Sequence, residues 1–241
     1  YGLYERVKGF WDNSPLSASG LPSPGELALL EPLRADLPEA VFTADAFVPP
    51  VSGERQLDRG NLRRAAQLLD AAGWVIPEGA RDGLRRKDGQ TLRVQILNES
   101  QTFDRVINPY VQNLRAAGID AVHERVDDAQ LEDRKRNHDF DLINVHLGQD
   151  MIPGAGLQQY FGSKATGDVF NAMGLANPAV DALITQVEAA TTQEELSTRV
   201  HALDRVLRAL HFWVPQWFKG KHTVAYWDMY AHPATLPPYS L

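Results

Sequence analysis

The sequence of 241 residues contains no cysteine and no long apolar run. The first absence excludes disulfide bonds, thiolate metal sites and a cysteine nucleophile, although it does not identify a compartment. Because about 18 consecutive apolar residues are needed to cross a membrane, no spanning helix is expected. Long runs of Lys or Arg are also missing and the formal net charge is −7, which argues against a nucleic-acid-binding surface.

The sequence also lacks a recognisable natural start. Residues 1–11 contain no initiator methionine, no basic segment and no apolar core of a signal peptide. This start agrees with a fragment of a longer protein, and export cannot be read from it directly.

Common catalytic and metal-binding signatures are missing as well. Gly220-Lys-His-Thr223 lacks the glycine spacing and the adjoining Ser or Thr of a phosphate-binding loop, and neither H-E-x-x-H nor G-x-S-x-G occurs. The seven histidines include no close pair with metal-ligand spacing on one helix face. We expect neither a cofactor nor a bound metal.

Hydrophobic residues make up 44% of the chain, which is enough for a buried core. Ser23-Pro24-Gly25-Glu26 has the pattern of a capping box and predicts a helix to about Arg34. Residues 38–56 are interpreted as a long surface connection, followed by a helix that Gly73 ends. Asn177 and Thr192 are expected to cap two later amphipathic helices.

The middle of the chain alternates between strand and helix patterns. Asp88-Gly89 predicts a hairpin turn, and strands over 91–97, 119–126 and 140–146 are separated by two helices, the second beginning at Asp127. Such a β-α-β-α-β unit favours a parallel sheet, with ligands beyond the carboxyl ends of the strands. The loops 98–101 and 147–151 should therefore border a cleft.

Four segments resemble one family of binding proteins. They are the aromatic block from Trp213 to Asp228 and the segments Ala116-Ala-Gly-Ile-Asp120, Asp139-Phe-Asp-Leu-Ile143 and Asn177-Pro-Ala-Val-Asp-Ala-Leu-Ile184. They resemble the second half of bacterial extracellular solute-binding proteins of family 5, which serve oligopeptide ABC importers, and within it the microcin-C/oligopeptide subgroup.

This resemblance implies an α/β fold: a type II periplasmic-binding-protein-like lobe with a mixed, partly parallel sheet and flanking helices, from a two-lobed protein. Residues 1–212 would form most of the second lobe, and residues 213–241 would return to the first lobe, which this chain lacks. The tail is expected to form two short strands, 214–218 and 223–227. Without the first lobe, an exposed apolar patch is expected at Trp213, Trp217, Tyr226 and Trp227.

The resemblance also implies the function. The chain would belong to a non-enzymatic periplasmic receptor that captures peptides or peptide-like solutes by lobe closure and delivers them to a membrane ABC permease. Its partners would be the ligand, the permease and the missing N-terminal lobe, and not nucleic acid.

The segment Asn144-Val-His-Leu-Gly-Gln-Asp-Met-Ile-Pro153 is the main ligand-binding candidate. In the wider family an Asp near this point can pair with the amino terminus of the peptide, and an aromatic residue often precedes it. Here His146 occupies the aromatic position, Gln149 aligns with the anchor and Asp150 follows it. A peptide amine could pair with Asp150 and hydrogen-bond to Gln149. Alternatively, Asp150 caps a solvated loop and His146 is an ordinary histidine at a strand end.

Four further residues complete the candidate site. Asn98 and Ser100 lie in the first loop, where both also suit helix starts; Asn171 could order the opposing loop. Trp217 and its neighbour Gln216 lie where the chain should cross between lobes, and Trp217 could stack on a ligand or pack in the core.

Two other functions remain open. Asp139 and Asp141 could hold a metal and a nucleotide-sugar in a transferase site, although a polar entrance to a strand needs the same residues. A scaffolding protein without transport is the second alternative.

Overall fold

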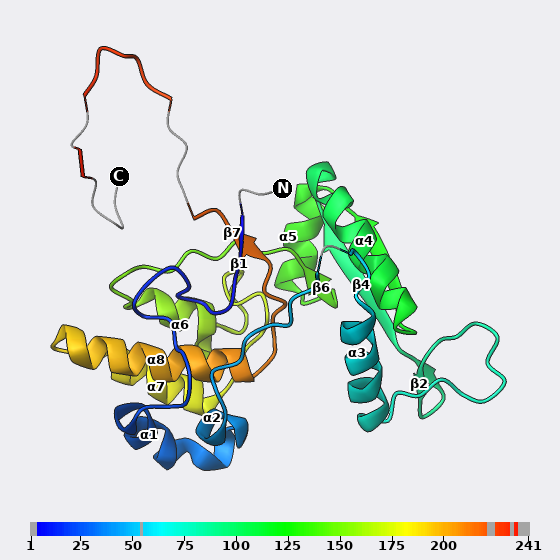
Figure 1. Cartoon of the computed structure of the whole chain (residues 1–241), viewed down its shortest axis with the longest axis horizontal. Helices are drawn as coiled ribbons and strands as arrows, with labels where there is room; N and C mark the ends of the chain where they lie inside the picture. The colour runs from blue at the N-terminus through cyan, green and yellow to red at the C-terminus, as the bar shows by residue number, and fades with distance from the viewer. Residues whose placement is uncertain (1–3, 54, 221–224, 232–233, 236–241) are drawn as a thin grey trace.

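The computed structural model describes residues 4–53, 55–220, 225–231 and 234–235. They form a helical group and an α/β group, with a short two-stranded ribbon between them (Figure 1). The helical group contains α1 (Pro24–Leu30), η1 (Glu31–Asp36), α2 (Ala40–Thr43), α6 (Gly156–Phe161), η3 (Ser163–Ala165), α7 (Pro178–Glu188) and α8 (Gln193–Ala209). The α/β group contains α3 (Arg59–Ala71), β2 (Arg86–Lys87), β3 (Gln90–Thr91), β4 (Arg93–Asn98), η2 (Gln101–Phe103), α4 (Asp104–Ala116), β5 (Asp120–Arg125), α5 (Asp128–Arg136) and β6 (Leu142–Ile143).

The predicted parallel sheet is confirmed. β4 lies between β5 and β6 and pairs with both in parallel. One face packs on α4 around a core that includes Ile96, Ile107 and Val111. β6 has only two residues instead of the expected seven, because after Ile143 the chain leaves the sheet for the loop that borders the cleft.

Local signals place most element boundaries. Ser23 and Glu26 form the complete capping box, and Asp127 and Asn177 accept hydrogen bonds from the first turns of α5 and α7. Thr192 caps α8 as predicted, but the carboxylate of Glu195 accepts from Thr191 instead of the cap residue. The hairpin β2–β3 turns at Asp88-Gly89, both with positive φ, as expected for a tight hairpin turn.

Helix α8 crosses the helical group and carries three buried charged residues, Asp204, Arg205 and Arg208. The Asp204 carboxylate accepts hydrogen bonds from the backbone N–H groups of Phe10 (2.8 Å) and Ala18 (2.9 Å) and from Arg208 (3.1 Å). Burial raises the pKa of Asp204, while Arg208 and the two N–H groups act in the opposite direction. These bonds hold the N-terminal segment across α8.

The two arginines extend this attachment. Arg205 forms a buried ion pair with Glu26 (2.9 Å) and donates to the carbonyl of Gly20. Arg208 donates to the carbonyls of Ala18 (2.8 Å) and Phe47 (2.7 Å). Buried guanidinium groups thus satisfy carbonyls that the irregular segments could not otherwise bury.

The prediction of a surface connection over 38–56 is therefore wrong in part. The segment contains α2, and its Val41 and Phe42 are buried in the helical core. Arg205 and Arg208 account for this, since they bind the carbonyls of Ala44 and Phe47 on either side of Ala46.

The tail also differs from its prediction. β7 (Trp217–Phe218) is a strand, but it pairs antiparallel with β1 (Glu5–Arg6) from the other end of the chain. Residues 223–224 of the expected second strand lie outside the described residues, and residues 225–227 are not in a strand. A hairpin requires adjacent segments, whereas here the partner is distant in sequence.

Within the described ranges, none of the helices combines the length and apolar character required to cross a bilayer.

Replacing Asp204 by Ala should lower the free energy of unfolding by about 3–5 kcal/mol, because it leaves Arg208 and two backbone donors buried without their acceptor. Urea denaturation followed by circular dichroism measures the change. Glu194→Ala, at an exposed position of the same helix, is the control and should change stability by less than about 0.5 kcal/mol. A loss below about 1 kcal/mol for Asp204→Ala would show that the buried network is not required.

Gly118→Ala should destabilise the α/β group by at least about 1–2 kcal/mol. Gly118 has φ +86° after α4, and an added Cβ would lie 2.9 Å from Arg85 Cγ and 3.1 Å from the Gly83 carbonyl oxygen. Gly167→Ala is the matched control, since its Cβ would meet nothing within 4 Å and its φ is not positive. Equal denaturation midpoints for the two variants would contradict the close approach.

Candidate functional site

A cleft of about 1800 Å³ runs between the helical group and the α/β group. Glu99 of the first predicted loop and Leu147, Gln149 and Met151 of the second line it, so the prediction that these loops border a cleft is confirmed. The β1–β7 ribbon and the cleft-facing side of α4 also contribute to the lining. The cleft therefore collects residues from segments that are far apart in sequence.

The ribbon supplies an aromatic wall. Arg6 is the register partner of Trp217, and the Trp217 ring stacks on Phe103 with ring centroids 6.2 Å apart and an interplanar angle of 18°. Tyr4 meets the same indole edge-on at 6.3 Å. Trp217 is 37% exposed and lines the cleft, so its indole is partly packed and partly open to a ligand.

Amide side chains tie the ribbon to the sheet. Gln216 donates to the side-chain oxygen of Asn144 (3.1 Å), and Asn144 donates to that of Asn98 (3.5 Å). Asn98 is the last residue of β4 and Asn144 follows β6, both at the carboxyl edge of the sheet. On the helical side, Trp213 stacks on Phe10 at 4.1 Å. The ribbon is thereby attached to both groups.

The three candidates in the second loop are separated by the structure. His146 and Gln149 line the cleft, whereas Asp150 is exposed and is not part of the lining. The structure thus brings His146 and Gln149 to the cleft with Trp217 and leaves Asp150 next to it.

The remaining candidates have local structural roles. Asn98 is buried, and its amide donates to the carbonyl of Ser100 (2.7 Å) and to Asp104 (3.3 Å). Asn171 is fully buried and orders its own loop through the carbonyl of Gly162 and both backbone groups of Leu175. Asn98, Ser100 and Asn171 do not line the cleft.

Three cleft residues carry a buried side-chain polar atom without a hydrogen-bond partner in the described structure: Trp11 Nε1, Gln149 Nε2 and Asn113 Oδ1. Two are donors and one is an acceptor. An unpaired buried polar group costs about 1–3 kcal/mol. These atoms lie below the surface of the cleft wall, so they are not by themselves contact points for a ligand.

Sequence reasoning missed Arg6, Glu99 and Tyr110, all of which line the cleft. Burial raises the pKa of Tyr110 and lowers that of Arg6, and the interaction between the two opposes each shift. No local signal in the sequence marks Arg6, because its position depends on pairing with the distant β7; Glu99 could have been found as the charged residue of the predicted first loop.

Asp139 and Asp141 precede β6 instead of lying in it, and both are engaged. Asp139 forms an ion pair with Arg134 (2.9 Å), and Asp141 accepts from the backbone N–H of Gln95 (2.7 Å). No group of three or more possible metal ligands is found among the residues that the structure describes. Asp139 and Asp141 are thus both engaged in contacts within the protein.

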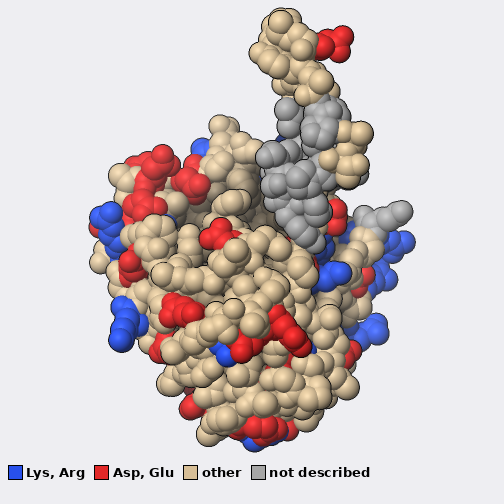
Figure 2. Space-filling view, turned by 90° about the vertical axis from the view of Figure 1, so that its left-hand side faces the viewer, with Lys and Arg blue, Asp and Glu red and all other residues tan. Residues whose placement is uncertain are grey.

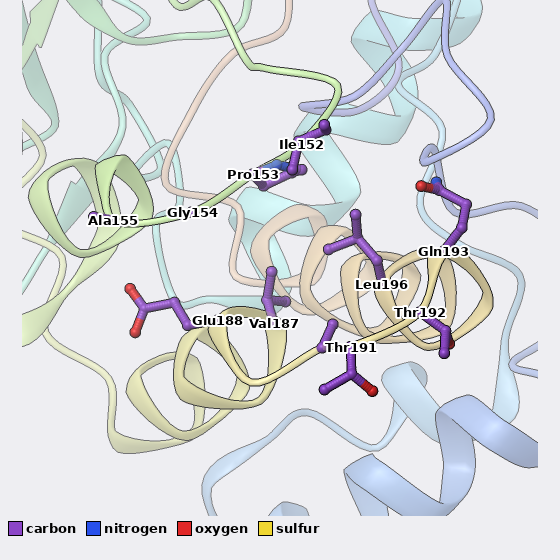
Figure 3. A pocket seen from close by; sticks show the side chains of 11 residues that line it. Ile152, Pro153, Gly154, Ala155, Val187, Glu188, Thr191, Thr192, Gln193 and Leu196 are labelled. Atoms are coloured by element: carbon purple, nitrogen blue, oxygen red, sulfur yellow. The ribbon is translucent and has the colours of Figure 1, made fainter.

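A second hollow of about 620 Å³ lies on the helical group and shares no lining residue with the cleft. Figure 3 shows the side chains of Ile152, Val187 and Leu196 around it, with Glu188 and Thr191 at the turn between α7 and α8. It contains none of the candidate residues from the sequence.

Acidic side chains are scattered over the face in Figure 2, where Lys and Arg lie mostly near the edges. On this face the described residues form no continuous basic patch.

The aromatic tail is largely exposed. Trp217 is 37%, Tyr226 56% and Trp227 78% exposed, so these three side chains are exposed as expected. Trp213 was also expected to be exposed, but it is partly buried against Phe10. Residues 225–231 extend away from the two groups in Figure 1.

The chain matches known proteins along its whole length. Residues 33–168 match the family model described as "Bacterial extracellular solute-binding proteins, family 5 Middle". The chain is 37% identical over 243 residues to "Probable peptide-binding protein YejA" of Agrobacterium fabrum, covering 100% of this chain and 39% of that protein. It is 33% identical over 242 residues to YejA of Escherichia coli, covering 100% and 40%. The chain thus spans about two fifths of the length of these relatives.

Solved structures show the same fold at low sequence identity. The oligopeptide-binding protein AppA from Bacillus subtilis, solved with a nonapeptide, has a TM-score of 0.59 at 17% identity, over 80% of this chain and 39% of AppA. Lactococcal OppA, solved with an endogenous peptide in the closed conformation, has a TM-score of 0.58 at 14% identity, over 90% and 35%. The fold is that of part of a type II periplasmic binding protein. With a family model that covers more than half of its residues, the chain belongs to the bacterial extracellular solute-binding proteins of family 5.

Proposed function

We propose that this chain is part of a periplasmic receptor that captures peptides or peptide-like solutes by lobe closure and delivers them to an ABC import permease. Residues 1–212 would form most of its second lobe, and residues 213–241 would return to a first lobe. The function would be binding without catalysis. The names of the Agrobacterium relative and of AppA and OppA support peptides as the cargo.

The observation that carries the proposal is the composition of the cleft. Its volume of about 1800 Å³ exceeds the roughly 300–1,000 Å³ of a site for a drug-sized molecule. Trp217, Phe103 and Tyr4 offer apolar faces, while His146 and Gln149 add polar side chains to the lining. Such a surface fits an extended ligand with regularly spaced carbonyl and amide groups and varied side chains, which describes a peptide.

In the proposed complex, Trp217 stacks on the ligand while His146 and Gln149 hydrogen-bond to it. Asp150 would pair with the amino terminus from its place beside Gln149. Asn98 and Ser100 would keep the first loop in shape for contact, and Asn171 would do so for the opposing loop.

The exposed tail supports a contact with the rest of the receptor. Tyr226, Trp227 and Met229 have most of their surface exposed, and exposed apolar side chains close together in the chain are typical of an interaction site. We propose that the first lobe covers them.

Trp217→Ala in the full-length protein should weaken peptide binding about tenfold or more, since buried aromatic anchors commonly contribute more than 1 kcal/mol. Isothermal titration calorimetry with a peptide ligand measures the loss. Phe170→Ala is the control, because Phe170 is exposed, packs on Tyr160 and does not line the cleft. Unchanged affinity in a folded Trp217→Ala protein would contradict the proposed site.

Asp150→Asn should weaken a peptide with a free amine about tenfold, because a charge-assisted contact is lost. The acetylated analogue should change less than about twofold, as it has no charged amine to pair. Asp45→Asn, another exposed carboxylate outside the cleft, should affect neither peptide. Equal losses for the free and acetylated peptides would exclude the amine contact at Asp150.

A further inference from the structure

The region from residue 51 to residue 93 is basic in a chain that is acidic as a whole. It holds nine Lys and Arg residues and six Asp and Glu residues, a formal charge of +3, whereas the whole chain has −7. Two of its acidic side chains are already paired within the region. Asp70 forms an ion pair with Arg85 (2.5 Å), and Asp82 forms one with Arg86 (2.5 Å). Little acidic charge is thus left to neutralise the other cations.

Five guanidinium groups of this region have neither a hydrogen bond nor an ion pair with any residue that the structure describes. All five residues are exposed: Arg55, Arg59, Arg63, Arg64 and Arg81. The buried arginines of α8 contrast with them, since Arg205 and Arg208 are bound on several sides. None of the five lines the cleft, so their charges are available to a partner outside the candidate site.

Helix α3 carries its charges in the order opposite to the one that stabilises a helix. Its first two turns contain Arg59, Arg63 and Arg64, its first turn has no acidic residue, and its last turn has no basic residue. Because the amino end of a helix carries a partial positive charge, cations are unfavourable there, and the cap residue Asp58 offsets this only in part. Arg59 and Arg63 also lie one turn apart, where like charges repel. A conflict of this kind between local charge and fold is expected at a functional surface.

Exposed apolar side chains lie close to these arginines in the chain. They come before α3, in its last turn and directly after it: Leu57, Leu68, Val75 and Ile76. The segment after α3 is held at the end of the helix, because the ammonium of Lys87 donates to the carbonyl of Ala72 (3.0 Å) and Val75 pairs with Arg86. Figure 1 shows α3 and β2 at the same end of the α/β group. This end therefore combines unpaired cations with exposed apolar groups.

We propose that this surface, the five arginines and the four exposed apolar side chains, binds an anionic lipid surface. Guanidinium groups match the oxygens of phosphate head groups, and apolar side chains beside them can enter the boundary between head groups and acyl chains. The five arginines line neither the cleft nor the second hollow. Cations spread over an open surface suit a broad partner, whereas a small anion needs a pocket. The proposal goes beyond the proposed function, since it concerns a surface outside the cleft and requires no peptide.

The test is sedimentation of the full-length protein with lipid vesicles, without peptide. One set of vesicles is phosphatidylcholine alone, and the other contains about 30% phosphatidylglycerol, which makes it anionic. The protein should bind the anionic vesicles, and binding should weaken as salt is added, because salt screens exposed charges. The combined variant Arg59→Gln, Arg63→Gln and Arg64→Gln should lower the partition coefficient at least about tenfold, since each cation near the membrane contributes to binding.

A control variant separates the position of the charges from their number. Lys8→Gln, Arg136→Gln and Lys164→Gln together remove the same charge from exposed positions outside residues 51–93. This variant should change the partition coefficient by less than about twofold, because the effect of charges away from the membrane is screened. Circular dichroism checks that both variants are folded.

Three outcomes would overturn the proposal. The first is an equal loss of vesicle binding in the two combined variants, which would show that only the net charge matters. The second is equal binding of the unmodified protein to both kinds of vesicle. The third is no vesicle binding at all, which would leave an acidic protein as the partner of this surface. Peptide binding is measured separately by calorimetry, and its failure would count against the proposed function alone.

Discussion

The buried carboxylate of Asp204 is the interaction on which the arrangement of this chain depends. It accepts from the backbone of Phe10 and Ala18 and is balanced by Arg208 on the next turn of α8. A carboxylate in a fully buried place is stable only when such donors surround it. Gly9 is part of the same constraint, since a Cβ there would lie 2.8 Å from an Asp204 oxygen. The N-terminal segment is consequently fixed on α8 within a few residues of the ribbon.

The position of the cleft wall depends on this attachment of the N-terminal segment to α8. Phe10, held through its N–H by Asp204, stacks on Trp213, and the segments on which these two residues lie continue into β1 and β7. The ribbon then meets the α/β group through Trp217 on Phe103 and through Gln216 on Asn144. A polar cluster in one helix therefore determines where the aromatic wall and Arg6 face the sheet edge. Two separate hydrophobic cores lie on either side, so the ribbon and its contacts are the natural place for movement between them.

Features that depend on neighbouring residues could be predicted from the sequence, whereas features that depend on contacts between distant residues could not. Ser23, Asp127 and Asn177 were identified as caps because a cap depends only on its own first turn. The parallel direction of β4, β5 and β6 followed from their alternation with helices. The pairing of Glu5–Arg6 with Trp217–Phe218 could not be found in this way, since no local pattern links two short strands at opposite ends of the chain. The burial of Val41 and Phe42 could not be predicted for a similar reason. It relies on arginines of α8 that bind the neighbouring carbonyls.

The candidate site shows the same difference between local signals and distant contacts. His146, Gln149 and Trp217 were placed at the cleft by the rule for carboxyl ends of strands and by the resemblance to the family, and they line it. Arg6 depends on the distant pairing and was missed, and Asp150 lies between the lining residues Gln149 and Met151 without lining the cleft itself. The most direct test of the account is mass spectrometry of small molecules released by denaturation from the full-length protein after incubation with a peptide mixture. The account predicts peptides at close to one per protein molecule, whereas an extract without peptides, or one that contains nucleotide-sugars instead, would contradict it.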